Sequence, residues 1–95
     1  MKNKAIEMLE NNLKSDIVTV KFTKKNGEER IMKCTKCITK MQEVNPEFTL
    51  SVSDKPKKLP NFDVIVVYDV EKLGWRSFRK DSVIMFETEL FRVEE

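Results

Sequence analysis

The densest group of chemically informative residues is the segment 74–83, Gly-Trp-Arg-Ser-Phe-Arg-Lys-Asp-Ser-Val. It combines the only tryptophan of the chain with two arginines and a lysine. An aromatic ring can stack on a nucleic-acid base, and guanidinium or ammonium groups can hold phosphate. A strand here would have two faces, Trp75, Ser77 and Arg79 on one and Arg76, Phe78 and Lys80 on the other. We expect an exposed ring beside a guanidinium on the first face, and an aromatic anchor in a core on the second.

Other basic residues extend this candidate surface. A predicted hairpin tip carries two lysines, and the strand that follows it carries an arginine. The predicted ligand- or nucleic-acid-binding set is Trp75, Arg76, Arg79, Lys80, Lys24, Lys25 and Arg30. A further run, Lys55, Lys57 and Lys58, would lengthen the basic track. Affinity would fall as salt rises, because each phosphate contact releases counterions.

The same residues allow other interpretations. A partner protein could dock on an aromatic anchor flanked by arginine, which is typical of interface hot spots. A nucleotide could be captured in a pocket shared between copies, by stacking on Trp75 and phosphate contacts from Arg76. A purely structural interpretation packs the tryptophan across the end of the domain and pairs the arginines with acids such as Asp69 and Asp81. Nucleic-acid binding is the first hypothesis, and the others stay open.

Catalysis is not expected from this composition. The chain contains no histidine, the side chain that most often acts as a general base near neutral pH. With two glycines in total, it cannot form a glycine-rich phosphate loop. Cys34 and Cys37 are half of a structural zinc site, and the sequence has no second pair. We therefore predict no enzyme, no metal and no cofactor, with two reduced cysteines at the end of a strand.

Charge is spread unevenly along the chain, although the net charge is only +2. Lysine and arginine concentrate within residues 16–40, and glutamate concentrates within residues 84–95. This asymmetry predicts a basic face and an acidic tail, unless both are ordinary solvated surface. No apolar run approaches the ~20 residues of a membrane-spanning helix, and the first residues lack the apolar middle of a signal peptide. We predict a cytosolic protein with no membrane partner; a homo-oligomer is one open possibility.

The first part of the chain predicts a helix and then a hairpin. Residues 3–14 place apolar side chains at helical spacing. Residues 17–23 alternate as a strand, and Asn26-Gly27 is a strong hairpin signal because both residue types tolerate positive φ. The return strand is expected at about 28–35, with Ile31 near an edge. The residues expected to face inward are Val18, Val20, Phe22, Met32 and Cys34.

The rest of the chain predicts shorter elements. In order, they are one or two helical turns within 36–44, an irregular excursion over 45–62 with a short strand near Phe48 and Leu50, a central strand at 63–69, a turn at 71–74, a strand at 75–80, a single helical turn at 81–83 and a last strand at 84–92. Gly74 is expected to supply positive φ in its turn. Long excursions such as 45–62 are often functional.

This order of elements predicts an α+β fold in a single domain, residues 1–95. We expect an N-terminal helix (1–15) packed on a small antiparallel SH3-like or Sm-like β-barrel of about five strands (16–95). An irregular insert interrupts the barrel at about 40–62. Closing the sheet would hide the strand edges that so small a protein otherwise exposes.

Two stretches of the sequence resemble a known family. The first is Phe22-Thr23-Lys24-Lys25-Asn26-Gly27 with Arg30, Met32, Cys34 and Thr35; the second is Tyr68-Asp69-Val70-Glu71-Lys72, then Gly74-Trp75-Arg76-Ser77-Phe78-Arg79 with Asp81-Ser82-Val83. Together they resemble the WYL-like, Sm-like SH3 β-barrel family of small T-even-type bacteriophage proteins of uncertain function. The resemblance implies a phage-encoded accessory protein in the host cytosol, with Trp75 and Arg76 facing a ligand. It implies nucleic acid as the ligand, or alternatively a host protein or a nucleotide signal of host defence.

Overall fold

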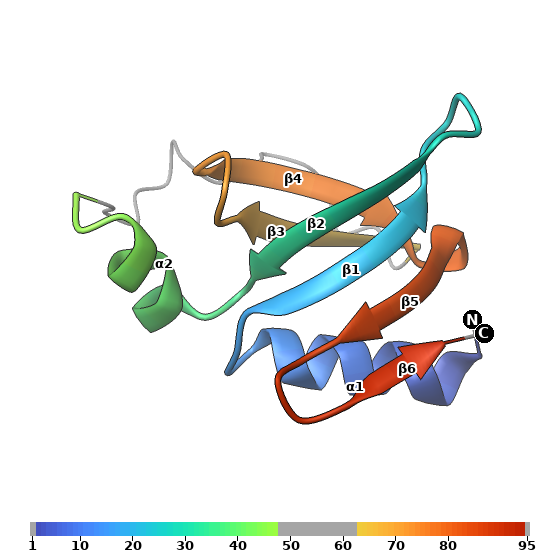
Figure 1. Ribbon diagram of the computed structural model, residues 1–95, viewed down its shortest axis with the longest axis horizontal. Helices are drawn as coiled ribbons and strands as arrows, with labels where there is room; N and C mark the ends of the chain where they lie inside the picture. Colours follow the sequence, from blue (N-terminus) through green and yellow to red (C-terminus); the bar gives the residue numbers. More distant parts are fainter. Residues whose placement is uncertain (1, 48–62, 95) are drawn as a thin grey trace.

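The computed structural model describes residues 2–47 and 63–94, which form two α-helices and a six-stranded antiparallel sheet (Figure 1). The helices are α1 (Asn3–Leu13) and α2 (Ile38–Val44). The strands are β1 (Val18–Thr23), β2 (Glu29–Thr35), β3 (Val64–Asp69), β4 (Gly74–Arg79), β5 (Val83–Glu87) and β6 (Arg92–Glu94), with a 3-10 turn, η1 (Lys80–Ser82), before β5. Their spatial order is β4-β3-β2-β1-β5-β6.

The main core lies between one face of this sheet and α1. In Figure 1 the helix lies beneath β1, β5 and β6. The core residues from α1 are Ile6, Leu9 and Leu13, and the strands contribute Val18, Val20, Phe22, Met32, Cys34, Ile65, Val67, Phe78, Val83 and Phe86. Each large aliphatic side chain buried in this way contributes about 1.5–3 kcal/mol. The predicted helix and the predicted inward-facing set are therefore confirmed.

The first hairpin, β1–β2, follows its sequence signals. Six residue pairs join the strands, from Val18 opposite Cys34 to Thr23 opposite Glu29. Gly27 has φ +88°, as the Asn-Gly pair predicts. Ile31 is 61% exposed. It pairs with Lys21 of β1 and has no partner in β3, which pairs with β2 only at Cys34 and Thr35, so it lies on a stretch of β2 that is open on one side, as expected.

The second hairpin, β3–β4, also has six residue pairs, from Val64 opposite Arg79 to Asp69 opposite Gly74. Its turn corrects one prediction, because the residue with positive φ is Leu73, at +54°, and not Gly74. The physical reason lies in Asp69, whose Oδ1 accepts hydrogen bonds from the N–H groups of Glu71 and Lys72 at 2.9 and 3.0 Å. These bonds fix the turn so that its left-handed residue falls one position before the glycine.

The C-terminal strand prediction and the closed sheet are both corrected. The expected strand at 84–92 is split into β5 and β6, because the N–H of Thr88 donates to the carbonyl of Phe91 at 2.9 Å and reverses the chain. Within the described residues the sheet is not closed, and β4 and β6 are its two outer strands. The architecture is a helix packed on an open, SH3-like or Sm-like sheet with one strand more than expected.

A narrow joint connects the two hairpins. β2 and β3 share only two residue pairs, Cys34 with Asp69 and Thr35 with Tyr68. The hydroxyl of Thr35, fully buried, shares its one proton between the carbonyl oxygens of Asp16 at 2.8 Å and Leu13 at 3.2 Å, and accepts from the N–H of Cys37. This one side chain therefore ties the end of β2 to the end of α1 and the start of α2.

The helix predicted within 36–44 is confirmed by α2, which occupies the first part of the expected insert. It packs on the outer side of the second hairpin through a small cluster of Met41 and Tyr68, with Val44, Val70 and Trp75 partly buried around them. The strand expected near Phe48 and Leu50, and the lysines at 55, 57 and 58, lie outside the described residues. The single-domain boundaries stay a prediction.

Candidate nucleic-acid interface

Trp75 is held in a small cluster and is not the exposed platform that the sequence predicts. Its ring meets Tyr68 edge-on, with ring centroids 5.7 Å apart and an interplanar angle of 80°. Its indole Nε1 is buried and has no hydrogen-bond acceptor among the residues that the structure describes. The cause is α2, whose Met41 and Val44 share the same cluster and cover this end of the sheet. Free stacking of a base on this ring is therefore obstructed.

The rest of the predicted surface divides between the two ends of β4. At one end, Phe22 and Phe78 stack with ring centroids 5.1 Å apart. Four predicted site residues follow these two rings within three positions along the chain, and we call them the tip group: Lys24, Lys25, Arg79 and Lys80. The ring contact thus connects two basic segments that are more than fifty positions apart in sequence.

Three of the four tip-group cations have acidic partners. The closest contacts are Lys24 to Glu28 at 3.8 Å, Arg79 to Asp81 at 3.1 Å and Lys80 to Glu10 at 3.5 Å. Such surface pairs contribute roughly 0–1 kcal/mol each, so a phosphate can replace the carboxylate at little cost. Lys25 is exposed at the hairpin tip and has no ion pair within the described part of the chain.

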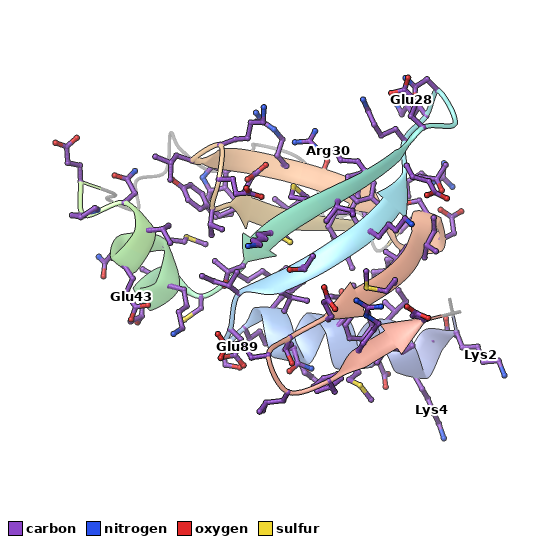
Figure 2. The ribbon with its side chains drawn as sticks, in the orientation of Figure 1. Lys2, Lys4, Glu28, Arg30, Glu43 and Glu89 are labelled. Atoms are coloured by element: carbon purple, nitrogen blue, oxygen red, sulfur yellow. The ribbon has the colours of Figure 1, made fainter. Side chains whose placement is uncertain are left out.

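At the other end of β4, two arginines lie near the start of the strand, and we call them the turn group: Arg30 and Arg76. Arg30 reaches across from β2 (Figure 2), and its Nη2 lies 3.4 Å from Oδ2 of the buried Asp69. Gly74 is the residue opposite Asp69, and a Cβ atom on it would lie 3.4 Å from Nη1 of Arg76. Both guanidinium groups therefore lie beside the Asp69–Gly74 pair.

Arg76 differs from the other cations in its bonding. Its side chain is exposed, and its Nη1 donates to the carbonyl of Trp75 at 2.9 Å. Within the described residues it forms no ion pair with a carboxylate. No other hydrogen bond of this side chain to a described residue is seen, and a guanidinium can hold phosphate with two parallel hydrogen bonds.

The outer edge of β4 adds backbone donors between the two groups. Lys80 N donates to Asp63 O at 2.8 Å, so even-numbered residues direct their backbone groups toward β3. The carbonyls of Trp75 and Arg79 accept instead from side chains, Arg76 Nη1 and Ser82 Oγ. β3 is the one strand that pairs with β4 in the described residues. The N–H groups of Trp75, Ser77 and Arg79 therefore point outward, where backbone N–H groups can contact phosphate.

The two cysteines are separated by their environments. Cys34 is fully buried in the core, where its thiol donates to the carbonyl of Val18. Burial, and then the charge of Asp69, raises the pKa of Cys34 from 9.0 to about 12, which keeps the thiol protonated and unreactive near neutral pH. Cys37 is partly exposed at the start of α2, and both thiols are free. In the described residues, no group of His, Cys, Asp and Glu side chains could hold a metal ion.

Comparison with known proteins agrees with this geometry. The family described as WYL_2, Sm-like SH3 beta-barrel fold, matches residues 6–84 of the 95. The chain belongs to this family. Neither the curated proteins nor the solved structures contain a match. The match covers most of α1, all of β1 to β4 and the first two residues of β5, and the WYL-like resemblance seen in the sequence is confirmed at this level.

The sequence does not show how two residues organise the interface. Asp69 stands at a strand end, where an aspartate usually caps a turn, and in the structure it both holds the β3–β4 turn and pairs with Arg30. Phe22 was assigned to the core, but its stacking on Phe78 also sets where the tip group gathers. An aspartate at the end of an apolar strand and five residues before a Gly-Trp pair is a usable signal of the first. Nothing local in the sequence signals the second.

The described residues contain no helix that is long and apolar enough to span a membrane.

Proposed function

We propose that this protein binds single-stranded nucleic acid along the outer edge of β4, from the turn group to the tip group. The single observation that carries the proposal is the exposed guanidinium of Arg76, which has a backbone carbonyl as its partner and no carboxylate in the described residues. Outward N–H groups of β4 continue from it toward Lys24, Lys25 and Arg79. A groove or edge lined with such donors follows a phosphate backbone.

The roles within this set differ from those that the sequence suggests. In the proposed complex the protein holds the strand mainly by its phosphates. Arg76 and Lys25 are the main proposed phosphate contacts, because neither has an acidic partner in the described residues. Trp75 acts as a positioning residue, since its packing on Tyr68 fixes the carbonyl that holds Arg76. Recognition would depend weakly on base sequence, because phosphate contacts carry no sequence information directly.

The family supports the proposal without deciding it. Small β-barrels of SH3-like and Sm-like architecture are suited to binding single strands through loops and exposed strands. We further propose the context that the sequence resemblance implies, a non-enzymatic accessory protein of a phage acting in the host cytosol. Nucleotide capture gains no support from the groove in the described residues, because Asp16 and Glu89 line it and would repel phosphate.

The test is a titration of the protein with labelled single-stranded RNA, single-stranded DNA and duplex, followed by fluorescence anisotropy at several salt concentrations. We expect single strands to bind with an affinity that falls as salt rises, with a slope of about −0.7 per phosphate contact. Changing Arg76→Ala should weaken binding and reduce the slope by about one contact. The tryptophan fluorescence of the same samples should change, since Trp75 adjoins the site.

Arg92→Ala is the matched control, because Arg92 is an exposed arginine on β6 at the opposite edge of the sheet. It should leave both affinity and salt slope unchanged. Equal losses from Arg76→Ala and Arg92→Ala would indicate attraction by overall charge and would remove β4 as the site. Absence of binding by all three nucleic acids, with folded protein, would refute the proposed function.

A further inference from the structure

The β3–β4 turn presents an unusual leucine to solvent. Leu73 combines φ +54° with 47% exposure of a large apolar side chain. Residues with a Cβ rarely adopt this left-handed conformation, and glycine or asparagine is the usual choice. Neither burial nor backbone geometry explains a leucine here. Lys72 and Arg76, both exposed, outweigh the one exposed carboxylate of the turn, Glu71, so the charge around Leu73 is net positive.

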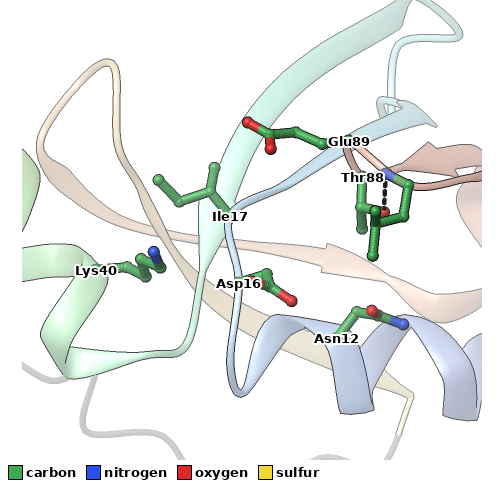
Figure 3. A pocket seen from close by; sticks show the side chains of 7 residues that line it. Asn12, Asp16, Ile17, Lys40, Thr88 and Glu89 are labelled. Carbon is green, nitrogen blue, oxygen red and sulfur yellow. Dashed lines mark hydrogen bonds between the residues drawn. The ribbon is translucent and has the colours of Figure 1, made fainter.

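A groove with the opposite character lies elsewhere on the molecule (Figure 3). It has a volume of about 300 Å3 and is lined by Asn12, Asp16, Ile17, Lys40, Thr88, Glu89 and Leu90. Its walls come from the end of α1, the loop before β1, α2 and the β5–β6 turn. Leu90 is 90% exposed beside it, although the turn requires no apolar residue.

The charge of this groove is negative. Asp16 and Glu89 contribute two carboxylates, while the one ammonium, Lys40 Nζ, lies 3.5 Å from Glu43 Oε2. Ile17 and Leu90 give the groove an apolar component. The groove is therefore complementary to an aliphatic side chain flanked by cations, which is what the β3–β4 turn presents.

We propose that the protein associates head to tail, with the β3–β4 turn of one copy seated in the Asp16–Glu89 groove of the next. Leu73 would pack on Ile17 and Leu90, and Lys72 would pair with Glu89 or Asp16. In Figure 1 the β3–β4 turn lies in the upper left of the molecule and the β5–β6 turn at the lower edge. The turn and the groove are formed by different segments, so every copy offers both to a neighbour. Contacts of this heterologous kind form rings or open chains.

The experiment is sedimentation equilibrium on the whole chain without nucleic acid, from about 10 µM to about 1 mM, the range in which small interfaces dissociate. We expect self-association of the wild type, and at least tenfold weaker association of two variants, Leu73→Asn and Leu90→Asn. Asparagine suits both turns, so neither substitution should impair folding, which thermal unfolding checks. Ile31→Asn is the matched control, since Ile31 is an exposed apolar residue on the sheet face and should have no effect.

Mixing distinguishes this arrangement from other contacts. The Leu73→Asn variant keeps an intact groove and the Leu90→Asn variant keeps an intact turn, so an equimolar mixture should form a one-to-one dimer although each alone is monomeric. A symmetric contact of turn with turn would not be restored by mixing. A wild type that stays monomeric over the whole range, or a mixture that stays monomeric, overturns the proposal. Both variants keep Arg76 and the tip group, so their nucleic-acid affinity tests the proposed function separately.

Discussion

The two hairpin turns each contain one residue with positive φ, but they are stabilised in different ways. In the β1–β2 turn, the residue with positive φ is Gly27, in open space with no atom within 4 Å of where its Cβ would lie. In the β3–β4 turn, Leu73 takes the left-handed conformation although Gly74 is next to it. The buried carboxylate of Asp69 stabilises this turn by accepting hydrogen bonds from two of its backbone N–H groups. The first turn is stabilised by its own residue types. The second depends on Asp69, which frees residue 73 from the usual choice of glycine or asparagine.

Removing the carboxylate should therefore break the second turn and spare the first. Asp69→Ala deletes two hydrogen bonds from backbone N–H groups and the pairing with Arg30. We expect a loss of about 3 kcal/mol in the free energy of unfolding, since bonds to a charged acceptor contribute about 1.5 kcal/mol or more each. Urea denaturation measures it. Asp81→Ala, at an exposed ion pair, is the control and should cost less than about 1 kcal/mol.

Alkaline pH should weaken the point where the hairpins meet, at Cys34. The pKa of this thiol is raised from 9.0 to about 12 in the fold, so the folded thiol stays neutral where the unfolded thiol ionises. Stability from this group is fully present below pH 9 and falls by about 1.4 kcal/mol per pH unit above it, until the folded thiol also ionises.

The measurement compares urea denaturation of the wild type and of Cys34→Ala at pH 7, 9 and 10. Other groups titrate in this range, so the informative quantity is the difference in pH dependence between the two proteins. We expect the wild type to lose about 1 kcal/mol more than the variant between pH 9 and pH 10, because about half of the unfolded thiol is already ionised at pH 9. Parallel curves would show that ionisation of Cys34 does not limit stability.

The glycine turn should respond to a single methyl group. Gly27→Ala places a Cβ at φ +88°, and the cost is backbone strain because the surrounding space is open. We expect a loss of about 1 kcal/mol, visible as a lower thermal midpoint. Asn at position 27 tolerates positive φ better, and Gly27→Asn should recover part of the loss. An alanine variant as stable as the wild type would contradict the assigned turn geometry.

The leucine turn should respond in the opposite direction, with the smallest effect. Leu73→Asn replaces a strained, exposed residue with one that adopts the left-handed conformation readily, and we expect a gain of about 0.5–1 kcal/mol. Thermal unfolding at low protein concentration measures the gain on the monomer. A loss of stability would mean that Leu73 makes an intramolecular contact that outweighs its strain.

Much of the fold follows from local signals. The alternation of Val18, Val20 and Phe22 predicts both strand and buried face, and Asn26-Gly27 predicts the first turn, because backbone preference and burial agree there. In the second turn, Gly74 predicts the wrong position for the residue with positive φ, because the turn is set by the side chain of Asp69, five residues earlier. The end of the chain predicts one strand, because residues 88–91 contain no glycine or proline that would signal the turn seen there.

The candidate site was predicted in its residue types but not in its arrangement. The sequence identifies Arg76 and the basic hairpin tip, since both stand out by composition. It does not show that α2 packs on Trp75, because that contact joins residues about thirty positions apart. Nor does it show the groove, whose walls come from four separate segments. Long-range packing decides which side chains remain exposed, and local patterns do not encode it.

The joint between the hairpins has a consequence for how the molecule opens. Only two residue pairs connect β2 to β3, against six within each hairpin. Hydrogen exchange should therefore release β3 and β4 as one cooperative unit, before the amides of β1 and β2 that α1 covers. The strand that bears Arg76 would then be the part of the sheet with the lowest opening free energy. A binding partner would act as a clamp, slowing exchange in β4 far more than in β1.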